Sequence, residues 1–80
     1  MSTYIIENAF ILARNKTIGE DGSLVIIQPD DEINPLMCII KYQNDNVTFI
    51  SNDWQNRIYS VDDATILGDV ISIKYIFKNN

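Results

Sequence analysis

Few residues of this sequence have the type and spacing that catalysis or metal binding requires. Histidine is absent, and cysteine occurs once, at Cys38. The usual general base at neutral pH, the Ser-His-Asp arrangement and every histidine-containing metal site are therefore excluded. Cys38 lies in the apolar run 36–42, where a free cysteine behaves as a small hydrophobic residue rather than as a nucleophile or a zinc ligand. The sequence predicts no catalytic residue and no metal site.

The acidic residues form two groups, Asp30-Asp31-Glu32 and Asp62-Asp63. Adjacent carboxylates on a strand point to opposite faces, so the second group is poorly suited to acid–base chemistry. We favour solvated turns for both groups, because turns are often acidic, and keep as an alternative that they meet a basic protein surface or imitate phosphates. The glycines at 19, 22 and 68 form neither a phosphate-binding loop nor a dinucleotide fingerprint, so no cofactor is predicted.

Net charge and composition restrict the class of partner. Eleven acidic against six basic residues give a net charge of −5 over 80 residues. The basic residues are spread along the chain and form no stripe with interleaved aromatics, which disfavours direct nucleic-acid binding. No apolar run is long enough to span a membrane, and neither a signal peptide nor a disulfide pair is present, so we expect a cytoplasmic protein.

The elements that must position any functional residue are strands, because the apolar residues recur mainly with a period of two. Leu24 to Ile27 is an aliphatic run bounded by turn residues, and Leu36 to Tyr42 is a second run. The cluster at 44–46 turns the chain into a return strand, Val47 to Ser51, so these two runs predict a hairpin. Lys41 faces away from the apolar side of its strand and is expected to be solvated.

Further strands are predicted at both ends of the chain. Arg57 to Val61 is a short strand, and Val70 to Phe77 alternates as a half-buried strand should. The segments Tyr4 to Ile6 and Ala9 to Ala13 are compatible with two strands or with a strand and a helical turn, and we place strands there. The whole chain is thus predicted to be one mostly β domain, a partly closed barrel or sandwich of six to seven short strands.

A succession of short motifs resembles a known family. The segment Asp21 to Pro29, the strand Val47 to Ile50, the turn Ser51-Asn52-Asp53 and the strand Ile66 to Ile71 follow one another as the corresponding motifs do in the C-terminal domain of LexA-like repressors and related S24 autopeptidases. The match covers about Thr17 to Tyr75. The resemblance implies a mostly β fold, a cytoplasmic location and a domain that self-associates through its sheet.

The activity of that family is not expected here. Its members cleave their own linker with a serine nucleophile and a lysine base. By alignment, the lysine position falls on Ile50, and the serine position falls near Arg14 or Asn15, or on Ala9 in a gapped placement. None of these side chains does that chemistry. The helix-turn-helix that precedes this domain in the repressors is also missing before the first predicted strand, so operator recognition by that route is not expected.

The remaining hypothesis is a protein-binding module. Exposed aromatic residues are effective interface anchors, and Trp54 lies in the polar run 51–56, where a strand core is not expected. For Tyr59 and Tyr75, core packing and partner contact stay equally open. We expect an inactive regulatory module, of the type encoded by phages or mobile elements, that forms a homodimer or binds a related repressor or a host protein. The alternatives are an acidic inhibitor of a host nucleic-acid enzyme, which would use Asp30, Asp31 and Glu32, and, third, an unconventional autopeptidase.

Overall fold

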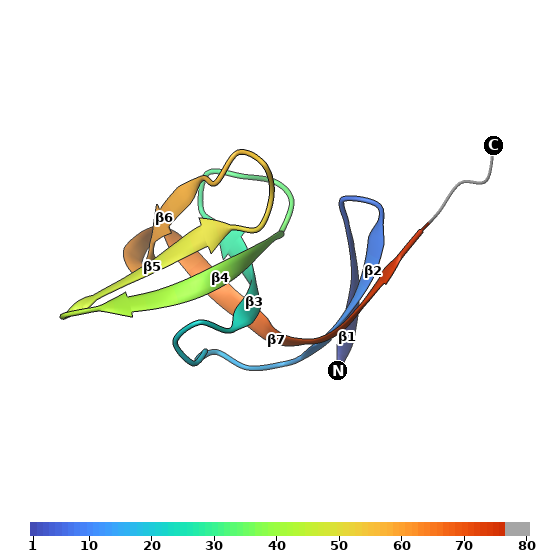
Figure 1. Cartoon of the computed structure of the whole chain (residues 1–80), viewed down its shortest axis with the longest axis horizontal. Helices are drawn as coiled ribbons and strands as arrows, with labels where there is room; N and C mark the ends of the chain where they lie inside the picture. The colour runs from blue at the N-terminus through green and yellow to red at the C-terminus, as the bar shows by residue number, and fades with distance from the viewer. Residues whose placement is uncertain (77–80) are drawn as a thin grey trace.

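The computed structural model of the protein describes residues 1–76 (Figure 1). They form one antiparallel sheet of seven strands in the order β1-β2-β7-β3-β4-β5-β6. The sheet curls into a half-barrel, which confirms the predicted mostly β, partly closed architecture. The elements are β1 (Ser2–Ile6), β2 (Ala9–Arg14), β3 (Leu24–Pro29), β4 (Leu36–Gln43), β5 (Asn46–Ser51), β6 (Ile58–Ser60), the 3₁₀ turn η1 (Val61–Asp63) and β7 (Ala64–Tyr75).

The N-terminal third, where the sequence left two possibilities, is a tight hairpin of β1 and β2. Its two turn residues, Glu7 and Asn8, both have positive φ, at 49° and 62°. Two consecutive residues of this kind form a type I′ turn, whose twist matches that of the flanking strands. The usual sequence marker of such a turn is a glycine at the second position, and Asn8 takes its place here.

The last strand differs from its prediction. It begins at Ala64 rather than at Val70 and pairs with β3 through its first half and with β2 through its second. The register shifts by one residue in each pairing, which leaves Leu67 and Ile71 as bulges on β7. The bulge at Leu67 interrupts the period-two pattern, so periodicity alone did not predict the first half of β7, although the family motifs placed a strand at Ile66 to Ile71. The predicted end at Phe77 lies outside the described residues.

A glycine allows β7 to approach the end of β2 closely. A Cβ atom at Gly68 would lie 2.8 Å from the carbonyl oxygen of Arg14 and 3.1 Å from the Cβ of Ala13. Glycine within a strand commonly marks such an approach of two backbones. Because β7 pairs first with β3 and then with β2, it joins the half-barrel to the β1–β2 hairpin (Figure 1).

The two faces of the sheet bury two separate cores. Val25 and Ile27 point into the half-barrel, around Phe49, whereas Ile26 points to the other face, where the β1–β2 hairpin packs. Strand β3 is therefore buried on both sides, which explains why its sequence is a continuous aliphatic run. Cys38 and Ile40 of β4 belong to the half-barrel core, as predicted, and Lys41 is exposed, also as predicted.

Candidate functional site

Two loops on one side of the half-barrel are tied together by polar side chains. One loop, residues 30–35, joins β3 to β4, and the other, residues 52–57, joins β5 to β6. Backbone hydrogen bonds fix the base of the second loop, from the Ser51 amide to the Arg57 carbonyl at 2.8 Å and from the Asn52 amide to the Met37 carbonyl at 2.8 Å. The second loop is thus anchored on the sheet before any side chain contributes.

Asp53 organises the interior of the 52–57 loop. Its Oδ1 accepts hydrogen bonds from the Gln55 amide at 2.9 Å, from the Asn56 amide at 3.2 Å and from the Ser51 hydroxyl at 2.9 Å. The Ser51 hydroxyl in turn accepts from the Arg57 amide at 2.7 Å. Aspartate side chains that bond to the backbone two and three residues later are a common way to stabilise a turn. This loop is held in one conformation by its own sequence.

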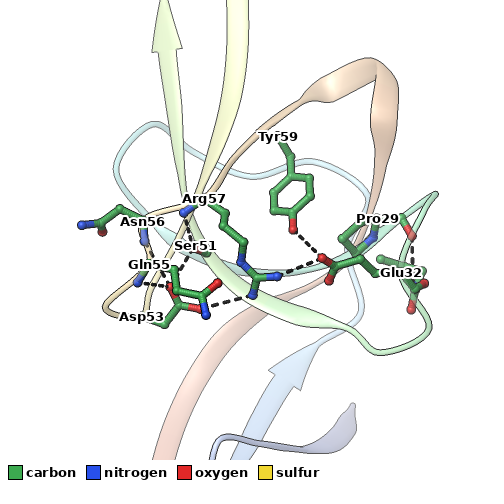
Figure 2. A network of polar contacts seen from close by, with 9 residues as sticks. Pro29, Glu32, Ser51, Asp53, Gln55, Asn56, Arg57 and Tyr59 are labelled. Atoms are coloured by element: carbon green, nitrogen blue, oxygen red, sulfur yellow. Dashed lines mark hydrogen bonds and ion pairs between the residues drawn. The ribbon is translucent and has the colours of Figure 1, made fainter.

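Arg57 connects this loop to the other one, as Figure 2 shows. Its guanidinium donates through Nη2 to Asp53 Oδ2 at 3.3 Å and through Nη1 to Glu32 Oε1 at 2.9 Å. The same Glu32 oxygen accepts a hydrogen bond from the Tyr59 hydroxyl at 2.8 Å. Four side chains from two loops and from β6 therefore form one network, which we call the Arg57 network: Glu32, Asp53, Arg57 and Tyr59.

Proton affinities in the network follow its geometry. Burial alone would raise the pKa of Asp53, but its hydrogen bonds from Ser51, Gln55, Arg57 and Asn56 outweigh burial and hold that pKa below its ordinary value. Burial, followed by the hydrogen bond to Glu32, raises the pKa of Tyr59 to about 12. Asp53 is thus ionised and Tyr59 protonated at neutral pH, which is the state in which all the hydrogen bonds form.

The two loops that the Arg57 network joins, residues 30–35 and 52–57, carry two highly exposed large apolar side chains. Trp54, next to Asp53, is 86% exposed, and Ile33, next to Glu32, is 95% exposed. The prediction that Trp54 lies outside the core is confirmed, whereas Ile33 was not singled out from the sequence. Each of these two residues follows a member of the Arg57 network, so the network fixes the backbone beside both side chains.

The other residues predicted to bind a partner fall into different environments. Tyr59 packs its ring against the half-barrel core and uses its hydroxyl within the network. Glu32 is likewise engaged internally, whereas Asp30 and Asp31 are exposed. Tyr75 is 57% exposed and pairs with Ala9 on β2, away from the two loops in the sheet order. The structure therefore brings together Asp30, Asp31, Glu32 and Tyr59. Trp54 lies on the 52–57 loop next to Asp53, and Tyr75 lies apart on β7.

The two acidic groups of the sequence meet in space. Asp30 and Asp31 line a pocket of about 410 Å³ together with Asp63, and its remaining lining residues are Ile58 and Tyr59 of β6. The Asp30 amide donates to the Asp63 carbonyl at 2.9 Å, which holds the two segments side by side. This juxtaposition could not be predicted from the sequence, because the groups are separated by three strands along the chain.

The structure also places the positions that the LexA-like resemblance assigns to catalysis. Ile50 lies on β5, Arg14 and Ala9 lie on β2, and Asn15 follows β2. In the sheet order, β7, β3 and β4 stand between β2 and β5, so these positions do not occupy neighbouring strands.

Cys38 is fully buried, and burial, reinforced by the charge of Asp53, raises its pKa to about 12.

Comparison with protein-family models and with curated proteins finds no match to this chain. The resemblance to LexA-like repressors therefore stays a prediction from the sequence. Within residues 1–76, no helix has the length and apolar character of a membrane span. In the same part of the chain, no group of three or more acidic, cysteine or histidine side chains is placed to hold a metal ion.

Proposed function

We propose that this chain is a non-catalytic interaction module that binds a regulatory protein through the 52–57 loop, with Trp54 as the anchor. The single observation that carries the proposal is a tryptophan that is 86% exposed on a loop braced by the Arg57 network. Tryptophan is among the residues that contribute most to protein interfaces, since it buries a large area with few rotatable bonds.

The hydrogen bonds that hold the 52–57 loop in place favour a binding role for the exposed Trp54. A loop that must be ordered when a partner binds loses part of the interaction energy to conformational entropy. Here the hydrogen bonds of Asp53 and Arg57 already order the backbone on both sides of Trp54. A partner therefore meets a preformed surface, and Ile33 on the neighbouring loop offers a second apolar side chain.

The LexA-like motifs of the sequence favour a regulatory protein, or a second copy of this chain, as the partner. Strand β1 supports self-association as one form of binding, because it ends the sheet and its five residues include neither a charge nor a proline. Natural edge strands usually carry such residues to prevent pairing with another chain. Self-association and binding of a different protein are separable by experiment.

The test is quantitative affinity capture with three forms of the tagged chain. Wild type, Trp54→Ala and Ile18→Ala are compared, and Ile18 is a matched control because it is 75% exposed and lies outside both loops. We expect a protein that is enriched with wild type and Ile18→Ala and reduced at least tenfold with Trp54→Ala, as for a hot-spot residue. Equal enrichment with all three forms would refute the role of Trp54.

Sedimentation over a concentration series decides whether the partner is a second copy. A wild-type dimer that dissociates on the Trp54→Ala substitution would assign the loop to self-association. A monomer at all concentrations, together with specific capture, would assign it to a different protein.

A further inference from the structure

Besides Trp54, the side of the molecule that carries the two loops has a second exposed feature, the free edge of strand β6. Strand β6 ends the sheet and pairs with β5 alone. Within residues 1–76, the backbone of Ile58–Ser60 makes no hydrogen bond outside this ladder. An edge of this type presents N–H and C=O groups to which an extended segment adds as a further strand. In Figure 1, β6 lies in the half-barrel, away from the β1–β2 hairpin.

The pocket described above opens directly beside this edge. Ile58, which is 70% exposed, and Tyr59 form its apolar wall, and Asp30, Asp31 and Asp63 supply carboxylates. Its volume of about 410 Å³ lies within the range of pockets that bind ligands. An apolar wall next to carboxylates matches a lysine or arginine side chain, whose stem is apolar and whose end is cationic.

In the described part of the chain, no cationic side chain pairs with the carboxylates of the pocket. Among residues 1–76, the ion pairs are those of Arg57 with Glu32 and with Asp53, and neither involves the pocket. Glu32 is thereby assigned to the Arg57 network, while Asp30, Asp31 and Asp63 form no ion pair within residues 1–76. The whole chain also carries a net charge of −5, which attracts a basic partner from a distance.

We propose that the β6 edge and its pocket bind an extended basic segment of a partner protein. The segment adds to the sheet along Ile58–Ser60, and an arginine or lysine on it enters the pocket, with its stem against Ile58 and Tyr59. The β6 edge of a second copy does not fit this edge, because it would bring the same carboxylates against one another. Charge thus opposes pairing of two β6 edges and favours a basic chain at this edge.

This inference rests on the proposed function in one respect, since the occupant belongs to a protein. The residues of the β6 edge and its pocket are, however, different from the 52–57 loop that carries Trp54, and the test of this inference does not depend on Trp54. The probe is a short acetylated peptide of alternating arginine and valine, titrated into the ¹⁵N-labelled full chain and followed by NMR. Three further peptides serve as controls: one with glutamate in place of arginine, one with lysine in place of arginine, and one N-methylated on the edge that would face β6.

We expect the arginine and lysine peptides to shift the amide resonances of Ile58–Ser60. Substitution of Asp30, Asp31 and Asp63 together by asparagine should weaken binding about tenfold, since each exposed charge pair contributes modestly. Asp45→Asn, a neutralisation at the exposed β4–β5 turn, should change the affinity by less than about twofold. The glutamate and N-methylated peptides should not bind.

Three results would overturn the inference: no shift at Ile58–Ser60, equal weakening by Asp45→Asn and by the triple substitution, or undiminished binding of the N-methylated peptide. Trp54→Ala should leave peptide affinity unchanged. If the peptide fails while Trp54-dependent capture persists, the β6 inference fails alone. If the peptide binds and Trp54-dependent capture is absent, the proposed role of Trp54 fails alone.

Discussion

Replacement of Asp53 by alanine tests the bracing of the 52–57 loop. The substitution removes one carboxylate that accepts hydrogen bonds from Ser51, Gln55, Asn56 and Arg57. Gln55 and Asn56 are exposed, so water replaces the lost partner of their amides at small cost. The Ser51 hydroxyl loses its acceptor at a larger cost, because Ser51 is only 2% exposed and water does not reach it easily.

The magnitude follows from these environments. A hydrogen bond to a charged acceptor contributes about 1.5–3 kcal/mol, and solvated amides add less, so we expect a loss of about 2–4 kcal/mol. A chain of this size has a free energy of unfolding of about 4–12 kcal/mol. The loss is thus a large fraction of the total and should lower the urea midpoint by about 1–3 M.

Equilibrium urea unfolding, followed by far-ultraviolet circular dichroism, measures the effect. Asp53→Asn is the matched variant: it keeps an oxygen for the Ser51 and backbone donors but loses the charge, so we expect about half the destabilisation. Glu20→Ala, at an exposed position, should stay within about 0.5 kcal/mol of wild type. A wild-type midpoint for Asp53→Ala, or equal loss for the asparagine and alanine variants, would refute the assigned role of Asp53.

Three other predictions concern the core, the network and the close approach of β7 to β2. Cys38, buried and with its pKa raised to about 12, should react with a thiol reagent at pH 8 roughly 100-fold more slowly in the native chain than in denaturant, and equal rates would contradict its burial. Tyr59 holds its proton more tightly in the folded state, with a pKa of about 12 against 10.0. Its stabilising contribution should therefore be complete below about pH 10 and lost as the pH rises toward 12, and an ultraviolet titration that shows no such late-ionising tyrosine, relative to Tyr59→Phe, would contradict the network. Gly68→Ala places a Cβ 2.8 Å from the Arg14 carbonyl oxygen, so we expect a loss of about 1–3 kcal/mol and a lower calorimetric Tm, and an unchanged Tm would show that β7 and β2 are less closely apposed.

The strands were predictable where side chains alternate and unpredictable where the backbone is irregular. The hairpin of β4 and β5 followed from its apolar face and from the polar turn at 44–46, where Asn44 adopts a φ of 56°. Periodicity missed the first half of β7, where the bulge at Leu67 interrupts the pattern, although the LexA-like motifs placed a strand at Ile66 to Ile71. A period of two is informative only over a regular ladder.

The candidate site was predictable only in its local part. Trp54 was identified because it interrupts a polar run, and the bonds of Asp53 to the next residues are of a kind that sequence can suggest. The bonds of Glu32 to Arg57 and Tyr59 join residues 25 and 27 positions apart, which no local pattern reveals. The meeting of the two acidic groups depends on the same long-range pairing of strands.

Hydrogen exchange of the captured complex tests the central claim most directly. With the partner bound, amides in the 52–57 loop, including that of Trp54, should exchange more slowly, whereas the exposed β4–β5 turn at 44–45 should be unaffected. Unchanged exchange throughout 52–57, with protection elsewhere, would contradict binding through this loop.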